Sequence, residues 1–71
     1  MSVASASARP GTEPTARELE VLRAWRDSGG DTAAVARDLG ITPDGARAIL
    51  ANVRARAGVR RTWQAVLRYL T

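Results

Sequence analysis

The side chains of this sequence that are best suited to chemistry are its eleven basic residues, all of which are arginine. A guanidinium group can grip O6 and N7 of a guanine with two hydrogen bonds, or bind a phosphate through its charge. The chain has no histidine and no cysteine, so the commonest general base, the commonest metal ligand and the thiol nucleophile are missing. Seven carboxylates remain, but no pair of them lies in an apolar stretch that would make one a general acid. We therefore expect a binding protein and not an enzyme, with no metal and no cofactor.

The arginines are concentrated in the second half of the chain. Residues 1–41 carry five arginines and six acids, whereas residues 42–71 carry six arginines and a single acid, Asp44. This asymmetry favours a surface that faces a polyanion on one side of the protein. A GC-rich coding sequence is an alternative source of so much arginine, because alanine is abundant and lysine is absent, but it explains the asymmetry less well.

The chain is long enough for one small domain. Residues 1–14 are rich in serine and alanine and then hold two prolines and a glycine, a composition typical of a disordered tail. The domain is predicted over residues 15–71. It begins with a helix, because Thr15 and Glu18 have the spacing of a capping box. The apolar face of that helix consists of Leu19, Val21, Leu22 and Trp25.

The same kinds of signal predict three more helices, over residues 32–39, 43–57 and 62–70. Asp31 or Thr32 caps the first of these, and Gly40 ends it. Thr42 caps the next, and Gly58 ends it. No stretch alternates between apolar and polar residues as a half-buried strand does. The expected fold is therefore all-α, a four-helix domain that contains a helix-turn-helix.

The helix over residues 43–57 has two distinct faces. Its inward positions are Ala46, Ile49, Leu50, Val53 and Ala57. On the opposite face Arg47 can reach a guanine edge, and Ala48 can touch a thymine methyl group. The expected DNA contacts are Thr42, Asp44, Arg47, Ala48, Ala51, Arg54, Arg56, Arg60 and Arg61, the later arginines on phosphates. The alternatives are an exposed ion pair between Arg47 and Asp44, a solvated cluster of arginines, and alanines that only favour the helix.

The last helix carries more apolar surface than one small core needs. Trp63, Val66, Leu67 and Leu70 recur at the spacing of one helix face. Packing within the chain is one explanation. The other is a two-fold contact with a second copy, or a contact with another protein. For that contact we expect Trp63, Leu67, Tyr69 and Leu70.

Several stretches together resemble the DNA-binding domain of the LuxR/NarL/GerE family of bacterial transcription factors. "TARELEVL" (15–22) is similar to the family's T-x-R-E-x-x-V-L, "VARDLGIT" (35–42) to I-A-x-x-L-x-I-S, and "NVRARAGV" (52–59) to N-I-x-x-K-L-G-V. The resemblance covers residues 15–70. Region 4 of the RNA polymerase sigma factors shares the opening and the helix-turn-helix. Its similarity is weaker, because the "GV" turn followed by a fourth amphipathic helix favours the LuxR type.

The resemblance implies a transcriptional regulator whose third helix lies in the major groove of duplex DNA and whose fourth helix packs or dimerises. The family usually has T-V-K at the start of the third helix, where this chain has Gly45, Ala46 and Arg47. The family usually has a His two residues after this Lys, and the matching residue of this chain is Ile49. Because the reading face has lost polar groups, the alternative function is a protein-interaction module on the same scaffold, which binds RNA polymerase or an adaptor.

No apolar run approaches the length of a membrane span, and the start "MSVASASARPG" has neither the basic residues nor the apolar stretch of a secretion signal. We expect a cytoplasmic bacterial protein, bound to the nucleoid when it is on DNA, with no membrane partner.

Overall fold

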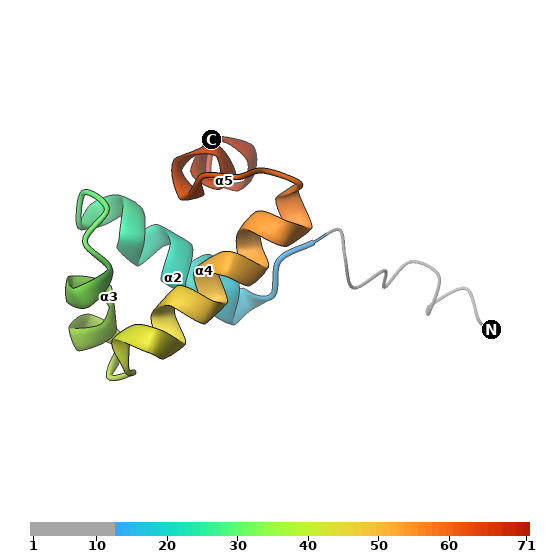
Figure 1. Ribbon diagram of the computed structural model, residues 1–71. Helices are drawn as coiled ribbons and strands as arrows, with labels where there is room; N and C mark the ends of the chain where they lie inside the picture. Colours follow the sequence, from blue (N-terminus) through green and yellow to red (C-terminus); the bar gives the residue numbers. More distant parts are fainter. Residues whose placement is uncertain (1–12) are drawn as a thin grey trace.

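The computed structural model describes residues 13–71, which form four α-helices and no strand (Figure 1). The helices are α2 (Ala16–Asp27), α3 (Thr32–Leu39), α4 (Pro43–Ala57) and α5 (Thr62–Tyr69). The prediction of an all-α domain with four helices is confirmed. The predicted tail over residues 1–14 lies outside the described residues, apart from Glu13 and Pro14.

Side-chain caps set where the first three helices begin. The Thr15 hydroxyl accepts from the backbone N–H of Glu18 at 3.1 Å, and the Glu18 carboxylate accepts from the backbone N–H of Thr15 at 2.8 Å. The Asp31 carboxylate accepts from the backbone N–H of Ala34 at 3.1 Å, so Asp31 and not Thr32 caps α3. The Thr42 hydroxyl caps α4. Each cap satisfies backbone donors that a helix start otherwise leaves unpaired.

The α3–α4 connection is a tight turn of three residues, Gly40 to Thr42. Gly40 adopts the left-handed conformation, with φ of 68°, which only glycine takes without a steric penalty. Ile41 then packs against the core. The two helices and this turn form a helix-turn-helix. Figure 1 shows α4 running across the molecule with α3 near its start and α5 near its end.

All four helices contribute to one core, in which α2 and α4 each pack against the other three helices while α3 and α5 do not meet. The buried apolar residues are Val21, Leu22, Val35, Ala36, Ala46, Leu50, Val53, Ala57 and Ala65. Of the predicted inward positions of α4, only Ile49 is not fully buried, and it lies at the edge of the core.

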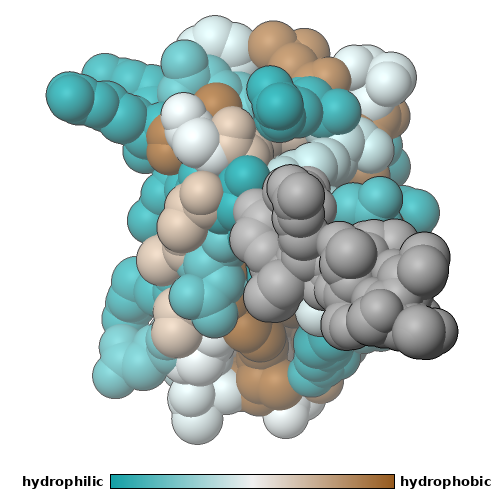
Figure 2. Space-filling model, turned by 90° about the vertical axis from the view of Figure 1, so that its right-hand side faces the viewer, coloured by the Kyte–Doolittle hydropathy of each residue, from teal (hydrophilic) through white to brown (hydrophobic). Residues whose placement is uncertain are grey.

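The orientation of α5 divides the apolar face predicted for it. Trp63 and Leu67 are 51% and 55% exposed, whereas Val66 and Leu70 pack against the core. The buried positions are Thr62 and Ala65. The Thr62 hydroxyl accepts from Arg54 of α4 at 2.8 Å, and the small Ala65 lets the two helices approach closely. These contacts turn α5 so that apolar atoms reach the surface at the top of the molecule (Figure 2). The helix also ends one residue earlier than predicted, with Leu70 as its C-cap.

Two hydroxyls on α5 allow a direct test of this packing. The Tyr69 hydroxyl is buried and meets no hydrogen-bond partner among the described residues, whereas the Thr62 hydroxyl is bonded to Arg54. Tyr69→Phe is expected to leave the free energy of unfolding unchanged or to raise it by up to about 1 kcal/mol, because it removes an unsatisfied group. Thr62→Val is expected to lower it by about 1–2 kcal/mol. Urea unfolding followed by circular dichroism measures both, and a clear loss for Tyr69→Phe would contradict the description.

Candidate nucleic-acid interface

One side of α4 is open to solvent along its length. We call it the open face of α4, and it consists of Asp44, Arg47, Ala48, Ala51 and Ala55, all exposed. Successive helical residues turn by about 100°, which brings these positions together opposite the buried ones. Arg47 is the one basic side chain among the residues of this face. The DNA contacts predicted from Asp44 to Ala51 are therefore brought together on one face of α4.

Arg47 forms an exposed ion pair with Asp44. The Arg47 Nη2 lies 2.7 Å from Asp44 Oδ1, and the two side chains are 63% and 91% exposed. Exposed pairs of this kind contribute little to stability. The pairing that we gave as the alternative for Arg47 thus occurs, and it leaves the guanidinium accessible. A stronger anionic partner can replace Asp44 with little loss of folding free energy.

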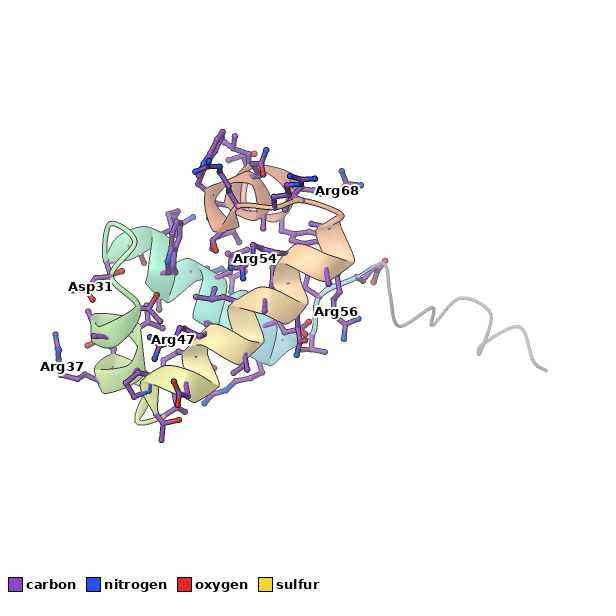
Figure 3. The ribbon with its side chains drawn as sticks, in the orientation of Figure 1. Asp31, Arg37, Arg47, Arg54, Arg56 and Arg68 are labelled. Carbon is purple, nitrogen blue, oxygen red and sulfur yellow. The ribbon has the colours of Figure 1, made fainter. Side chains whose placement is uncertain are left out.

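Arg54 lies two turns after Arg47 on the same side of α4 (Figure 3). Its side chain is half-buried, and its Nη1 donates to the Thr62 hydroxyl at 2.8 Å, which ties α4 to α5. A guanidinium has five N–H donors, so others remain for an anion. Arg54 therefore both positions α5 and lines the end of the open face.

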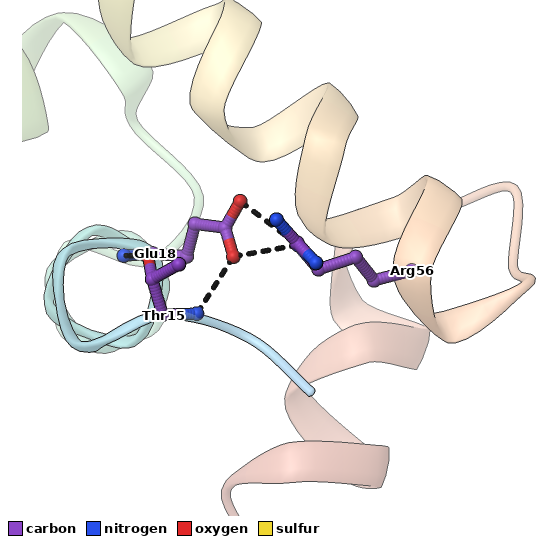
Figure 4. Close-up of polar contacts among 3 residues, drawn as sticks. All are labelled: Thr15, Glu18 and Arg56. Atoms are coloured by element: carbon purple, nitrogen blue, oxygen red, sulfur yellow. Dashed lines mark hydrogen bonds and ion pairs between the residues drawn. The ribbon is translucent and has the colours of Figure 1, made fainter. Parts of the chain in front are cut away.

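Arg56 lies on the opposite side of α4, because the nine residues from Arg47 to Arg56 rotate it about 180° around the helix axis (Figure 3). Its Nε lies 2.8 Å from Glu18 Oε1 and donates to Oε2 at 3.1 Å, and the Arg56 and Glu18 side chains are only 22% and 9% exposed (Figure 4). Glu18 is also the carboxylate of the α2 capping box. The structure thus separates Arg56 from the other predicted phosphate contacts and uses it to join α2 to α4.

Arg60 and Arg61 lie in the α4–α5 turn and are exposed. Their backbone N–H groups donate to Oε1 of Gln64 at 3.3 and 2.9 Å, which fixes the turn. Over residues 13–71, no ion pair includes Arg60, Arg61 or Arg68. The turn therefore presents two unpaired cations just beyond the end of α4.

Two polar side chains complete this surface. The Thr42 hydroxyl accepts from the backbone N–H of Gly45 at 3.0 Å, and its own hydrogen remains available to a phosphate at the start of α4. Asn52 is exposed one turn after Ala48. The prediction omitted Asn52, although an amide can pair with an adenine edge. The signal that could have identified it is its spacing of four residues from Ala48, which puts the two residues on the same side of the helix.

The predicted partner contacts on α5 are divided by the structure. Trp63 and Leu67 are exposed, whereas Tyr69 and Leu70 are half-buried against the core.

No group of acids within residues 13–71 could hold a metal ion, and no helix there is long and apolar enough to cross a membrane. Comparison with family models, curated proteins and solved structures gives no match to the chain.

Proposed function

We propose that this protein is a DNA-binding transcriptional regulator, a LuxR-type helix-turn-helix domain that places α4 in the major groove. The observation that supports this most is the open face of α4, which is exposed and carries alanines around Arg47. Short side chains allow the helix backbone to approach the floor of a groove that is about 12 Å wide. Arg47, near the start of α4, then reaches a base edge or a phosphate.

The positions of the other arginines support the same orientation. Arg54 lies at the far end of the open face, and Arg60 and Arg61 follow in the next turn. Contacts to phosphates require charge at the right place and no base pattern. These residues would hold the helix in the groove while Arg47 and Asn52 contact the bases.

A single copy is expected to discriminate weakly between sequences, because so few side chains on the open face can read bases. Helix-turn-helix proteins commonly bind two half-sites about one helical turn apart with two recognition helices. Specific binding therefore requires a second subunit, which is either another copy of this chain or a different protein. We expect this assembly in the bacterial cytoplasm, on the nucleoid.

The second candidate function is a protein-interaction module on the same scaffold, one that binds RNA polymerase or an adaptor. The exposed Trp63 and Leu67 favour it. An interaction module of this kind tolerates loss of Arg47 and fails when the apolar surface of α5 is changed.

Fluorescence anisotropy with a labelled duplex of random sequence, across a salt series, tests DNA binding. Wild-type affinity is expected to fall steeply with salt, because bound phosphates release counterions. Arg47→Ala is expected to bind about 5- to 10-fold more weakly, the equivalent of about 1 kcal/mol for one lost charged contact. Arg17→Ala is the matched control, because Arg17 also forms an exposed pair three residues along a helix, with Glu20 at 2.8 Å.

Arg17→Ala is expected to keep its affinity within about 2-fold, since exposed pairs contribute little. If the wild-type chain does not bind at low salt, or if both variants weaken equally, α4 is not the DNA-binding surface. The interaction module is then the better explanation.

A further inference from the structure

An apolar stripe on α5 has more surface than the fold uses. Trp63, Val66, Leu67 and Leu70 lie at i, i+3, i+4 and i+7, the spacing at which a helix anchors to a partner. We call these four residues the α5 stripe. Trp63 and Leu67 are the only large hydrophobic side chains exposed within residues 13–71, and Val66 and Leu70 are partly buried beside them.

The fold does not depend on the exposed half of this stripe. α5 is attached to the domain by Ala65, which is fully buried, and by Thr62, which is bonded to Arg54. Tyr69 adds a half-buried ring on the same side. Trp63 and Leu67 point away from these contacts. They can therefore be covered by another molecule without any change in the domain itself.

The surroundings of the α5 stripe are basic. Arg60 and Arg61 precede it, and Arg68 follows Leu67, about 100° around α5 on the Leu67 side of the stripe; all three are exposed. None of the three is in an ion pair within the described part of the chain, and residues 45–71 contain no acid. Figure 2 shows apolar and strongly polar surface side by side at the top of the molecule, where α5 lies.

This charge argues against a second copy as the occupant. A two-fold contact through the stripe would bring the arginines of one copy against those of the other, with no acid on α5 to pair with either set. Like charges placed together across an interface cost several kcal/mol. The occupant must instead bring carboxylates to the edges of its own apolar surface.

We propose that the α5 stripe binds an acidic amphipathic helix of another protein. Leucine- or methionine-type side chains of that helix would cover Trp63 and Leu67, and aspartates or glutamates on its flanks would pair with Arg60, Arg61 and Arg68. Large aromatic residues at the centre of a contact commonly carry much of the binding energy. A single-stranded nucleic acid also combines charge with stacking bases, but Val66, Leu67 and Leu70 offer no aromatic face on which to stack.

The test is a selection from a displayed library of helical peptides of roughly 16 residues, about 24 Å long, against the immobilised full chain without DNA. Leucines are fixed at helical spacing, and flanking positions vary among glutamate, lysine and glutamine. The enriched peptides are expected to be acidic. A labelled peptide from the enriched set is expected to bind the Leu67→Ser variant at least 10-fold more weakly than the wild-type chain, and the Arg68→Gln variant about 3-fold more weakly. Arg17→Gln is the control and keeps wild-type affinity.

Several outcomes would overturn the proposal. One is the absence of enrichment, or enrichment of lysine-rich or uncharged peptides. Another is a wild-type dimer in sedimentation that Leu67→Ser returns to a monomer, because a second copy would then cover the stripe. A third is displacement of the peptide by a single-stranded oligonucleotide that contacts Trp63. Leu67 is 55% exposed, so its serine variant should give the wild-type circular dichroism spectrum. The selection contains no DNA, so its failure and a failure of DNA binding by α4 are distinguishable.

Discussion

Replacing Glu18 with alanine is expected to lower the free energy of unfolding by about 3 kcal/mol. The Glu18 carboxylate is 9% exposed and serves two partners, the guanidinium of Arg56 and the backbone N–H of Thr15. Its loss leaves a largely buried guanidinium without a counter-charge and a helix start without half of its capping box. Domains of this size unfold with only about 3–9 kcal/mol. The variant should therefore keep only about 0–6 kcal/mol, and at the low end of this range about half of it is unfolded at room temperature.

Urea unfolding followed by circular dichroism measures this loss, and the chain provides a matched control. Glu20 pairs with Arg17 at the same 2.8 Å, but the two side chains are 53% and 46% exposed. Glu20→Ala is expected to cost no more than about 0.5 kcal/mol. If both variants lose the same free energy, burial of the Glu18–Arg56 pair does not have the role that we describe. Glu18→Gln retains an oxygen for the Thr15 N–H, so its loss of unfolding free energy should lie between the losses of Glu18→Ala and Glu20→Ala.

Replacing Ala51 with glutamate is expected to weaken DNA binding at least about 100-fold, since like charges brought together at an interface cost several kcal/mol. Ala51 is exposed near the middle of the open face of α4, between Arg47 and Arg54. A carboxylate there would meet the phosphates and base edges at the deepest part of the contact. Glutamate is also a good helix former, so the fold should be unaffected.

Ala16→Glu makes the same change at an exposed alanine of α2 and is the control. Anisotropy with duplex DNA at low salt should show wild-type affinity for Ala16→Glu within about 3-fold, the range expected from the change in net charge alone. Near-wild-type binding by Ala51→Glu, with its circular dichroism spectrum unchanged, would mean that DNA does not contact the middle of α4.

The positions of the helices could be predicted because their signals are local. The capping box of Thr15 and Glu18, the Asp31 and Thr42 caps and the left-handed Gly40 each depend on residues within a few positions in the chain. A hydroxyl or carboxylate at a cap has the same backbone donors available in almost any fold. The outward set of α4 followed in the same way from helical periodicity.

The contacts between helices could not be predicted from the same signals. Arg56 and Glu18 are 38 positions apart, so no local signal pairs them, although helical spacing alone puts Arg56 on the other side of α4 from Arg47. The turn of α5 depends on the bond from Arg54 to Thr62 and on the close approach that Ala65 allows. The apolar periodicity of α5 predicts one apolar face but not which part of it is covered: Val66 and Leu70 pack against the core, whereas Trp63 and Leu67 are exposed.

A titration of the ¹⁵N-labelled chain with a mixed-sequence duplex of roughly 16 base pairs, about one and a half helical turns, tests the central claim most directly. The amide resonances of Thr42 and of residues 44–55 and 60–61 should shift at low salt and return as salt rises, while those of α2 and of Trp63 and Leu67 stay in place. Shifts confined to α5, or none on α4, would contradict the placement of α4 in the major groove.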